Sequence, residues 1–99
     1  MRLTLLCFAG FTTGMLVANI QNYAGKEDKI SSCGVTSFLK REKMEDVVLI
    51  GPQLQNQANK IMESCHNKGI PCAFIDQNAY RNIDGESIFK QAEELYRSR

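Results

Sequence analysis

Cys7 is the residue of this chain that is best placed to do chemistry. It ends a short apolar run that starts at Leu3, and a segment of mostly small and hydroxyl side chains follows it. A strand that ends in a thiol and leads through a small-residue turn into a helix places the sulfur over converging backbone N–H groups. Those N–H groups and the positive end of the helix favour a thiolate, and they also hold a phosphate. Cys7 is therefore a candidate nucleophile or phosphate carrier, with a buried structural cysteine as the alternative.

The segment after Cys7 is predicted to form a phosphate-binding loop of eight residues: Phe8, Ala9, Gly10, Phe11, Thr12, Thr13, Gly14 and Met15. The two glycines allow close approach of the backbone, and the two threonine hydroxyls can donate hydrogen bonds. A thiol with an ordinary pKa of about 8.5 is mostly neutral at pH 7, and we expect the helix N-terminus to lower that pKa. The segment has no lysine or arginine, so a phosphate would be held mainly by dipoles.

The missing arginine separates two kinds of cysteine chemistry. A cysteine phosphatase uses a Cys-x5-Arg motif whose guanidinium clamps the phosphoryl group, whereas the sixth residue after Cys7 is Thr13. A phosphocysteine in this loop would have less help toward hydrolysis, which favours a carrier. A phosphatase or an arsenate-reductase-like hydrolytic enzyme stays as one alternative, and a non-enzymatic module regulated by phosphorylation as another. The Gly-Lys-Ser/Thr pattern of nucleotide-binding loops is absent.

Length and charge limit the other classes of function. A chain of 99 residues forms one domain, over 1–99, and its net charge of +1 argues against a nucleic-acid partner. The charged clusters at 26–29 and 40–43 mix both signs and are typical of solvated segments. The uncharged stretch from Leu3 to Gly25 is interrupted by glycine, threonine and asparagine, so we expect neither a signal peptide nor direct membrane insertion, and a cytoplasmic protein.

The remaining cysteines predict no special chemistry. Cys33, Cys65 and Cys72 fit small core residues with reduced thiols, because the chain lacks a dense cysteine framework. The spacing of Cys65, His66 and Cys72 matches no zinc pattern, so no metal and no cofactor is predicted. His66 is expected to be a solvated residue near a helix end.

The apolar pattern predicts an α/β fold, an open four-stranded parallel sheet flanked by helices on both faces. The expected strands are Leu3–Leu6, a short strand within Lys29–Thr36, Asp46–Ile50 and Pro71–Ile75. The expected helices start at Thr12 or Thr13, cover Ser37–Met44, run from Pro52 to Lys68, and begin at a cap on Asp84. The inner faces of the first and third helices are predicted to include Tyr23 and Met62. The segment Asp76–Ile83 is predicted to be a polar loop.

Ligands of such sheets bind beyond the carboxyl ends of the strands. Cys7, Gly51 and Asp76 each follow a predicted strand, so their loops are expected to meet at one edge. Gln53 could reach the phosphate loop from there or serve the turn, and Tyr80 could lie near the site or pack elsewhere.

Three motifs extend the argument: Leu5 to Val17 around the cysteine, Asp46 to Gln53 with its Gly-Pro-Gln end, and Ile75-Asp76 with Tyr80 and Asp84-Gly85. With these motifs the chain resembles, over essentially its whole length, the lactose/cellobiose-type IIB components of the bacterial phosphoenolpyruvate-dependent sugar phosphotransferase system. The resemblance departs from the family pattern at Phe8, where a small polar residue is usual, and at Gly14, where serine is frequent.

The resemblance implies a phosphoryl carrier. Cys7 matches the residue that takes a phosphoryl group from a phosphohistidine of the IIA partner and passes it to a sugar of the cellobiose, lactose or β-glucoside class. That sugar is bound by the membrane permease IIC. The loop from Phe8 to Met15 matches the phosphate cradle, and Gln53 and Tyr80 are possible neighbours of the site.

Overall fold

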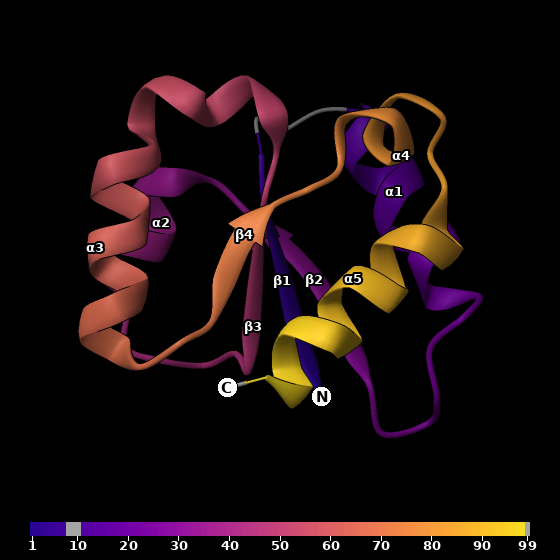
Figure 1. Ribbon diagram of the computed structural model, residues 1–99, viewed down its shortest axis with the longest axis horizontal. Coiled ribbons are helices and arrows are strands. Elements are labelled where there is room, and N and C mark those ends of the chain that lie inside the picture. Colours follow the sequence, from indigo (N-terminus) through magenta and orange to yellow (C-terminus); the bar gives the residue numbers. More distant parts are fainter. Residues whose placement is uncertain (8–10, 99) are drawn as a thin grey trace.

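Strands and helices alternate along the chain, as the apolar pattern predicts (Figure 1). The computed structural model describes residues 1–7 and 11–98, and the side chains of residues 11 and 12 are not included. The elements are β1 (Arg2–Leu6), α1 (Phe11–Gln21), β2 (Lys29–Cys33), α2 (Val35–Lys40), β3 (Val47–Ile50), the 3-10 helix η1 (Pro52–Gln57), α3 (Ala58–Lys68), β4 (Cys72–Phe74), α4 (Gln77–Arg81) and α5 (Gly85–Arg97).

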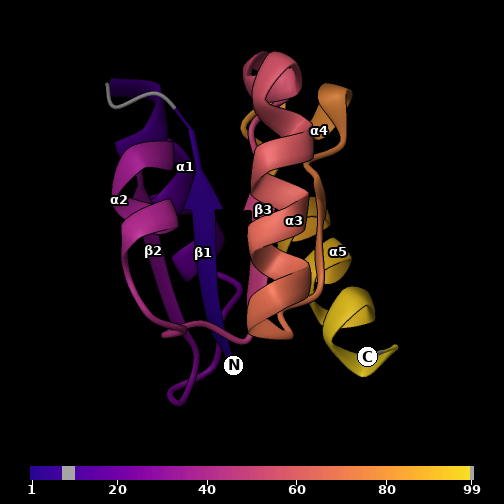
Figure 2. The same ribbon diagram turned by 90° about the vertical axis from the view of Figure 1, so that its left-hand side faces the viewer.

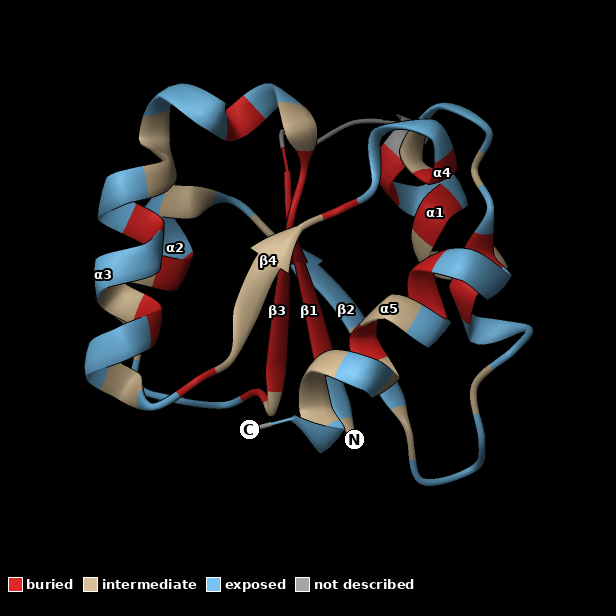
Figure 3. Ribbon diagram, viewed as in Figure 1, coloured by how far each residue is buried: buried red, intermediate tan, exposed pale blue. Residues whose placement is uncertain are grey.

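The four strands form one parallel sheet in the order β2-β1-β3-β4, which confirms the predicted fold class. Leu6 pairs with Cys33 on one side and with Ile50 on the other, and Ile50 pairs with Phe74. The carboxyl ends of all four strands therefore reach the same edge. The central strands β1 and β3 are almost wholly buried, whereas β2 is largely exposed (Figure 3).

Helices cover both faces of the sheet, which Figure 1 shows nearly edge-on. On one face, α1, α4 and α5 bury a cluster that includes Leu16, Ala79 and Ile88 against Leu3 and Leu5. The opposite face buries a second cluster, which contains Phe38 of α2 and Ile61 of α3. Within the described ranges, no helix combines the length and the apolar character that a membrane span requires.

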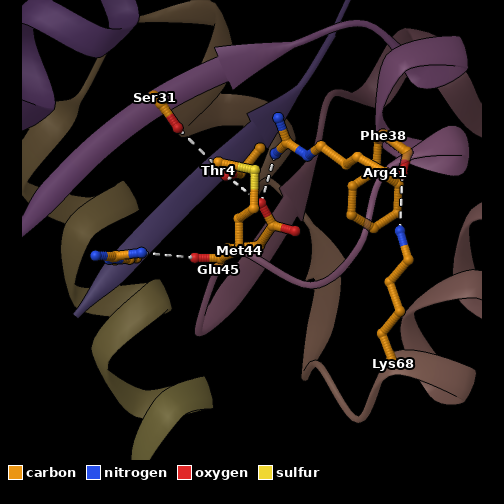
Figure 4. Close-up of polar contacts among 8 residues, drawn as sticks. Thr4, Ser31, Phe38, Arg41, Met44, Glu45 and Lys68 are labelled. Carbon is orange, nitrogen blue, oxygen red and sulfur yellow. Dashed lines mark hydrogen bonds and ion pairs between the residues drawn. The ribbon is translucent and has the colours of Figure 1, made fainter.

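The helices α2 and α3 are tied together by Lys68. Its Nζ donates to the carbonyl oxygen of Phe38 at 2.7 Å and lies 4.0 Å from the centre of the Phe38 ring (Figure 4). Gly69 ends α3 directly after this lysine, as the sequence predicts.

The largest difference from the sequence-based expectation is α4, which lies within the predicted polar loop Asp76–Ile83. Asp76 caps this helix by accepting a hydrogen bond from the backbone N–H of Ala79 at 3.0 Å, and Ala79 packs into the core. A five-residue helix with one buried side chain shows no apolar periodicity, so the pattern could not predict it. The cap predicted at Asp84 is confirmed, because its carboxylate accepts from the N–H of Ser87.

The first three predicted helices also differ from the structure in their bounds or in the side chains that they bury. The prediction that Tyr23 lies on the inner face of the first helix is wrong, because the N–H groups of residues 22–24 form tight turns beyond Gln21 and the side chain is 50% exposed. Met62 is exposed on α3, contrary to prediction. The second helix covers Val35–Lys40 instead of Ser37–Met44, and a kink at Leu54 separates η1 from α3.

The helices α1 and α5 touch at one very close contact. The N–H of Gly85 donates to Oδ1 of Asn19 at 2.9 Å. A β-carbon at Gly85 would lie 2.4 Å from that oxygen and 2.7 Å from the carbonyl oxygen of Asn19. The first residue of α5 must therefore be glycine for this packing.

Candidate functional site

Cys7 directly follows β1 at the edge of the sheet where the strands end. Its backbone N–H donates to the carbonyl oxygen of Cys33 at 3.4 Å, so the pairing between β1 and β2 extends to the thiol. The residue is only 2% exposed. The topology therefore holds the sulfur in a fixed place under the edge of the sheet.

Thr13, in the first turn of α1, is the hydrogen-bond partner of the thiol. The Cys7 Sγ and Thr13 Oγ1 atoms lie 3.2 Å apart, and Thr13 is itself buried. Either group can donate while the thiol is neutral, but only the hydroxyl can donate to a thiolate. The residue that stands where a phosphatase has its arginine is thus a neutral hydroxyl, which can donate to the sulfur when the thiol is ionised.

The pKa of the Cys7 thiol is raised above its ordinary value. Burial is the main cause, and the hydrogen bond with Thr13 lowers the pKa by less than burial raises it. The expectation of a lowered pKa is therefore wrong for this form of the site. It rested on the helix N-terminus alone and took no account of burial, which disfavours the charged form.

Gly51, which follows β3, packs directly against Cys7. Its N–H donates to the carbonyl oxygen of Leu6 at 2.7 Å. A β-carbon at this position would lie 3.2 Å from the Cys7 β-carbon and 2.7 Å from Oε1 of Gln53. The prediction that Cys7 and Gly51 meet at this edge is confirmed, and any side chain at position 51 would crowd Cys7 and the Leu6 carbonyl oxygen.

A hollow of about 240 Å³ opens beside the thiol. It is lined by Cys7, by the first turn of α2 from Gly34 to Ser37, and by Leu54 and Gln57 of η1. Among the residues that the structure describes, no lysine or arginine lines this hollow. The sequence did not predict α2 residues at this site, because a short strand was expected within Lys29–Thr36 and the second helix was expected to start only at Ser37. Gly34 directly after a strand was the signal that could have placed them at this edge.

Gln53 and Tyr80 form a pair at the same edge of the sheet. Nε2 of Gln53 donates to the Tyr80 hydroxyl at 2.7 Å, and Oε1 of Gln53 lies against the backbone of Gly51. A second hollow, of about 430 Å³, lies beside this pair and includes Arg81 in its lining. The pair is thus linked to Cys7 through Gly51, and its contact with a phosphoryl group remains a prediction. Asp76 instead serves as the cap of α4.

The rest of the predicted phosphate-binding loop is described only in part. Phe8, Ala9 and Gly10 lie outside the described residues, and Phe11 and Thr12 begin α1 without described side chains. Gly14 and Met15 follow Thr13 in α1 and are exposed.

The other three cysteines are free thiols that lie away from solvent to different degrees. Cys65 is buried, as a core residue should be, and Cys33 and Cys72 are half-buried against the same cluster. A hydrogen bond between Cys65 and Cys72 raises the pKa of Cys65 and lowers the pKa of Cys72. His66 is exposed near the end of α3, as predicted.

Sequence comparisons place this arrangement among known proteins. No family model matches the chain. It is 30% identical over 94 residues to the oligo-beta-mannoside-specific EIIB component of the PTS system of Bacillus subtilis strain 168, covering 92% of this chain and 91% of that protein. It is 26% identical to the galactose-specific EIIB component of Lactococcus lactis subsp. cremoris strain MG1363, with 94% of both chains covered.

Comparison with solved structures finds the same kind of protein as the sequence comparison. The solution structure of the cellobiose-specific phosphotransferase IIB component of Borrelia burgdorferi has a TM-score of 0.81 and 30% identity, over 99% of this chain and 93% of that one. The lactose-specific IIB domain of Streptococcus pneumoniae has a TM-score of 0.73, with 96% of this chain and 93% of that one covered. Its identity is 15%, so this second likeness concerns the fold alone.

Proposed function

Because the chain belongs to the IIB components of the sugar phosphotransferase system, we propose that Cys7 carries a phosphoryl group from a IIA protein to a sugar. The observation that supports this most is the environment of Cys7: a buried thiol at the carboxyl edge of the sheet, with a hydroxyl donor and no arginine or lysine in the described lining of its hollow. Such a site binds phosphate through dipoles and offers no guanidinium to activate it for attack by water.

In the proposed first step, the sulfur attacks the phosphorus of an N-phosphohistidine on the IIA protein. The S–P bond forms while the P–N bond breaks, and the thiol proton ends on the departing imidazole nitrogen. The raised pKa of Cys7 suits this exchange, because the resting thiol keeps the proton that the leaving group needs. Thr13 then donates its hydrogen bond to the sulfur whenever negative charge develops there.

The second step passes the group on. A sugar hydroxyl oxygen attacks the same phosphorus, the O–P bond forms as the S–P bond breaks, and the hydroxyl proton restores the thiol. Gln53 and Tyr80 are proposed to support the loop edge from the β3 side, through Gly51. The residues from Phe8 to Met15 are proposed as the phosphate cradle.

The sugar in this proposal is of the cellobiose, lactose or β-glucoside class and is presented by a membrane IIC permease. The protein acts on the cytoplasmic side, where the IIA protein meets it. Relatives of this chain are named for oligo-beta-mannosides, galactose and cellobiose. We propose that the membrane partner, which binds the sugar, makes most of the choice among them.

Phosphorylation of the purified protein tests the proposal. Incubation with a phosphorylated IIA protein is expected to add the mass of one phosphoryl group, and Cys7→Ser is expected to abolish the addition. Cys33→Ser is the matched control, because Cys33 lies on the neighbouring strand and should leave labelling intact. Labelling that persists in Cys7→Ser contradicts the proposal.

The fate of the label separates the carrier from its alternatives. Transfer to sugar in membrane vesicles that contain IIC supports the carrier. Rapid release of inorganic phosphate without an acceptor supports a hydrolytic enzyme, and a stable label that never moves to sugar supports a regulatory module.

A further inference from the structure

A third hollow, of about 410 Å³, lies toward the opposite edge of the sheet from Cys7. Arg2 and Lys29, the paired first residues of β1 and β2, line its rim, and Thr4 and its paired residue Ser31 in the middle of these strands form its floor. Figure 2 shows β2 extending past the end of α2, so this part of the sheet face is not covered by that helix. The volume falls in the range of small-molecule sites.

A chain of hydrogen bonds crosses the floor of the hollow (Figure 4). The hydroxyls of Ser31 and Thr4 lie 3.3 Å apart, and Thr4 donates to Oε2 of Glu45 at 2.9 Å. Arg41 donates to the same carboxylate oxygen at 2.5 Å. Because Thr4 gives its only proton to Glu45, Ser31 must donate to Thr4 and keeps its own lone pairs for another donor.

Two polar atoms in this cluster lack partners. Glu45 is 2% exposed, and its Oε1 has no hydrogen bond among residues 1–7 and 11–98. The same is true of Nε of Arg41. Buried polar groups are almost always paired, so an unpaired acceptor beside an unpaired donor calls for a group that satisfies both. A hydroxyl group does so, because it donates to a carboxylate and accepts from a guanidinium.

The hollow also has an excess of positive charge. Arg2, Lys29 and Arg41 line it against the single carboxylate of Glu45. Arg41 is held by Glu45, so Arg2 and Lys29 are the cations at the exposed rim. An anionic group on a ligand would meet them there, while its hydroxyl groups reach the floor.

We propose that this hollow binds a small phosphorylated polyol, of the sugar phosphate class, with the hydroxyls toward Glu45 and Arg41 and the phosphate toward Arg2 and Lys29. Inorganic phosphate offers the charge but would place a second anion beside the Glu45 carboxylate. Arg2 Nη1 donates to the carbonyl oxygen of Met44 at 3.5 Å, which leaves its charge unneutralised. A neutral sugar offers the hydroxyls but brings no anion to Arg2 and Lys29.

In this proposal the Met44 side chain moves aside when the ligand enters. It lines the same hollow and is 55% exposed, so it is free to change its position. Methionine is unbranched and changes rotamer easily, and its displacement opens the way to the Glu45 and Arg41 atoms that are buried in this structure.

The test is an NMR titration of the isotope-labelled protein with glucose 6-phosphate, glucose and inorganic phosphate as separate probes. We expect glucose 6-phosphate to give saturable shifts of the Thr4, Ser31 and Glu45 amides. Glucose and inorganic phosphate are expected to bind at least about tenfold more weakly. Absence of saturable shifts at these amides, or equal binding of inorganic phosphate, overturns the proposal.

Two variants test the proposed contacts with the phosphate and with the hydroxyl groups of the ligand separately. Lys29→Ala removes a rim charge from an exposed position and should weaken glucose 6-phosphate by about tenfold without unfolding the protein. Glu45→Gln should remove most of the preference for glucose 6-phosphate over inorganic phosphate. Lys60→Ala, on the exposed surface of α3, is the matched control and should bind as the native chain does. A Lys29→Ala protein that binds normally contradicts the assignment.

The titration is repeated in Cys7→Ser protein to keep the two sites apart. Binding at Thr4, Ser31 and Glu45 should persist there, and shifts confined to Thr13 and Gly14 would place the ligand at the Cys7 edge and refute the proposal. Binding of a sugar phosphate in this hollow does not depend on phosphorylation of Cys7.

Discussion

The two edges of the sheet each hold a buried reactive group beside a threonine, and they stabilise that group in opposite ways. At the carboxyl edge, Cys7 faces the Thr13 hydroxyl at 3.2 Å, and no cation lines the hollow beside it within the described chain. At the amino edge, Glu45 accepts from Thr4 at 2.9 Å and is paired with Arg41. One edge is neutral at rest and the other carries a fixed pair of charges.

The Cys7 edge is suited to a charge that is present only for a time, whereas the Glu45 edge is suited to a permanent charge. A thiol that receives and releases a phosphoryl group must not bind it too strongly, and dipoles without a fixed cation meet that requirement. A buried carboxylate, in contrast, is tolerated only with a paired cation and further hydrogen bonds. Each edge can therefore be changed separately, and four substitutions test this separation.

Gly51→Ala is expected to have the largest effect, at the Cys7 edge. The new β-carbon would meet the Cys7 β-carbon and the Leu6 carbonyl oxygen, both at 3.2 Å, and neither can move freely. We expect the free energy of unfolding to fall by about 3 kcal/mol, and phosphorylation of Cys7 to slow. Urea denaturation measures the first and mass spectrometry the second.

Gly14→Ala is the matched control for this substitution. No atom lies within 4 Å of a β-carbon there, and the residue is in a helix, so we expect a gain of up to about 1 kcal/mol. If Gly14→Ala lowered the free energy of unfolding as much as Gly51→Ala does, the close approach of Gly51 to Cys7 would not explain the loss of stability.

Glu45→Gln should have the next largest effect, at the opposite edge. It removes the charge that pairs with Arg41 while keeping the shape of the side chain, and we expect a loss of about 2 kcal/mol in unfolding free energy. Glu42→Gln, an exposed neighbour, should change stability by less than about 0.5 kcal/mol. If the folded Glu45→Gln protein showed an altered alkylation rate at Cys7, the two edges would not be independent.

Thr13→Val is expected to slow alkylation of Cys7. The pKa of the thiol is already raised by burial, so the thiolate fraction at neutral pH is small and alkylation by iodoacetamide should speed up as the pH rises. Loss of the hydroxyl removes the contact that lowers the pKa, so the rate at pH 7 should fall roughly fivefold, the equivalent of about 1 kcal/mol. Peptide mapping follows each cysteine, with Cys33 as the internal control; an unchanged rate at Cys7 would exclude the role of Thr13.

Tyr80→Phe should have the smallest effect. It removes the hydrogen bond from Gln53, which lies at the surface, so we expect a loss of about 0.5 kcal/mol and a modest slowing of phosphoryl transfer. Tyr23→Phe, at an exposed position outside the helices, is the control for removal of a hydroxyl. A stability loss greater than that from Glu45→Gln would place the Gln53–Tyr80 pair among the main supports of the fold.

The sequence predicted those parts of the molecule that depend on local pattern. The apolar runs before Cys7 and before Gly51 specify buried strands, and parallel strands bring their ends to one edge, so Cys7 and Gly51 were correctly placed together. Thr13 was found for the same reason, because it lies one short loop from Cys7 in the chain. Helix α4 was missed because a cap and a single buried alanine hold it.

The parts that depend on tertiary burial could not be predicted. The pKa of Cys7 follows from how deeply the thiol is covered, which no local motif reports. Arg41 belongs to a cluster of mixed charges that looked solvated, but the structure pairs it with buried Glu45 one helical turn away in sequence. Burial of such a pair depends on tertiary contacts with distant parts of the chain, such as the hydrogen bond that Thr4 donates to Glu45.

The close contact of Gly85 with Asn19 has a consequence for how the family can diverge. Helix α1 has Thr13 near its start and Asn19 near its end, so any side chain added at position 85 would shift the helix that sets the distance to the thiol. Positions 19 and 85 lie far from Cys7 and take no part in its chemistry. In related chains these two positions should nevertheless stay fixed or change together, because their contact positions Thr13 relative to a thiol that neither residue touches.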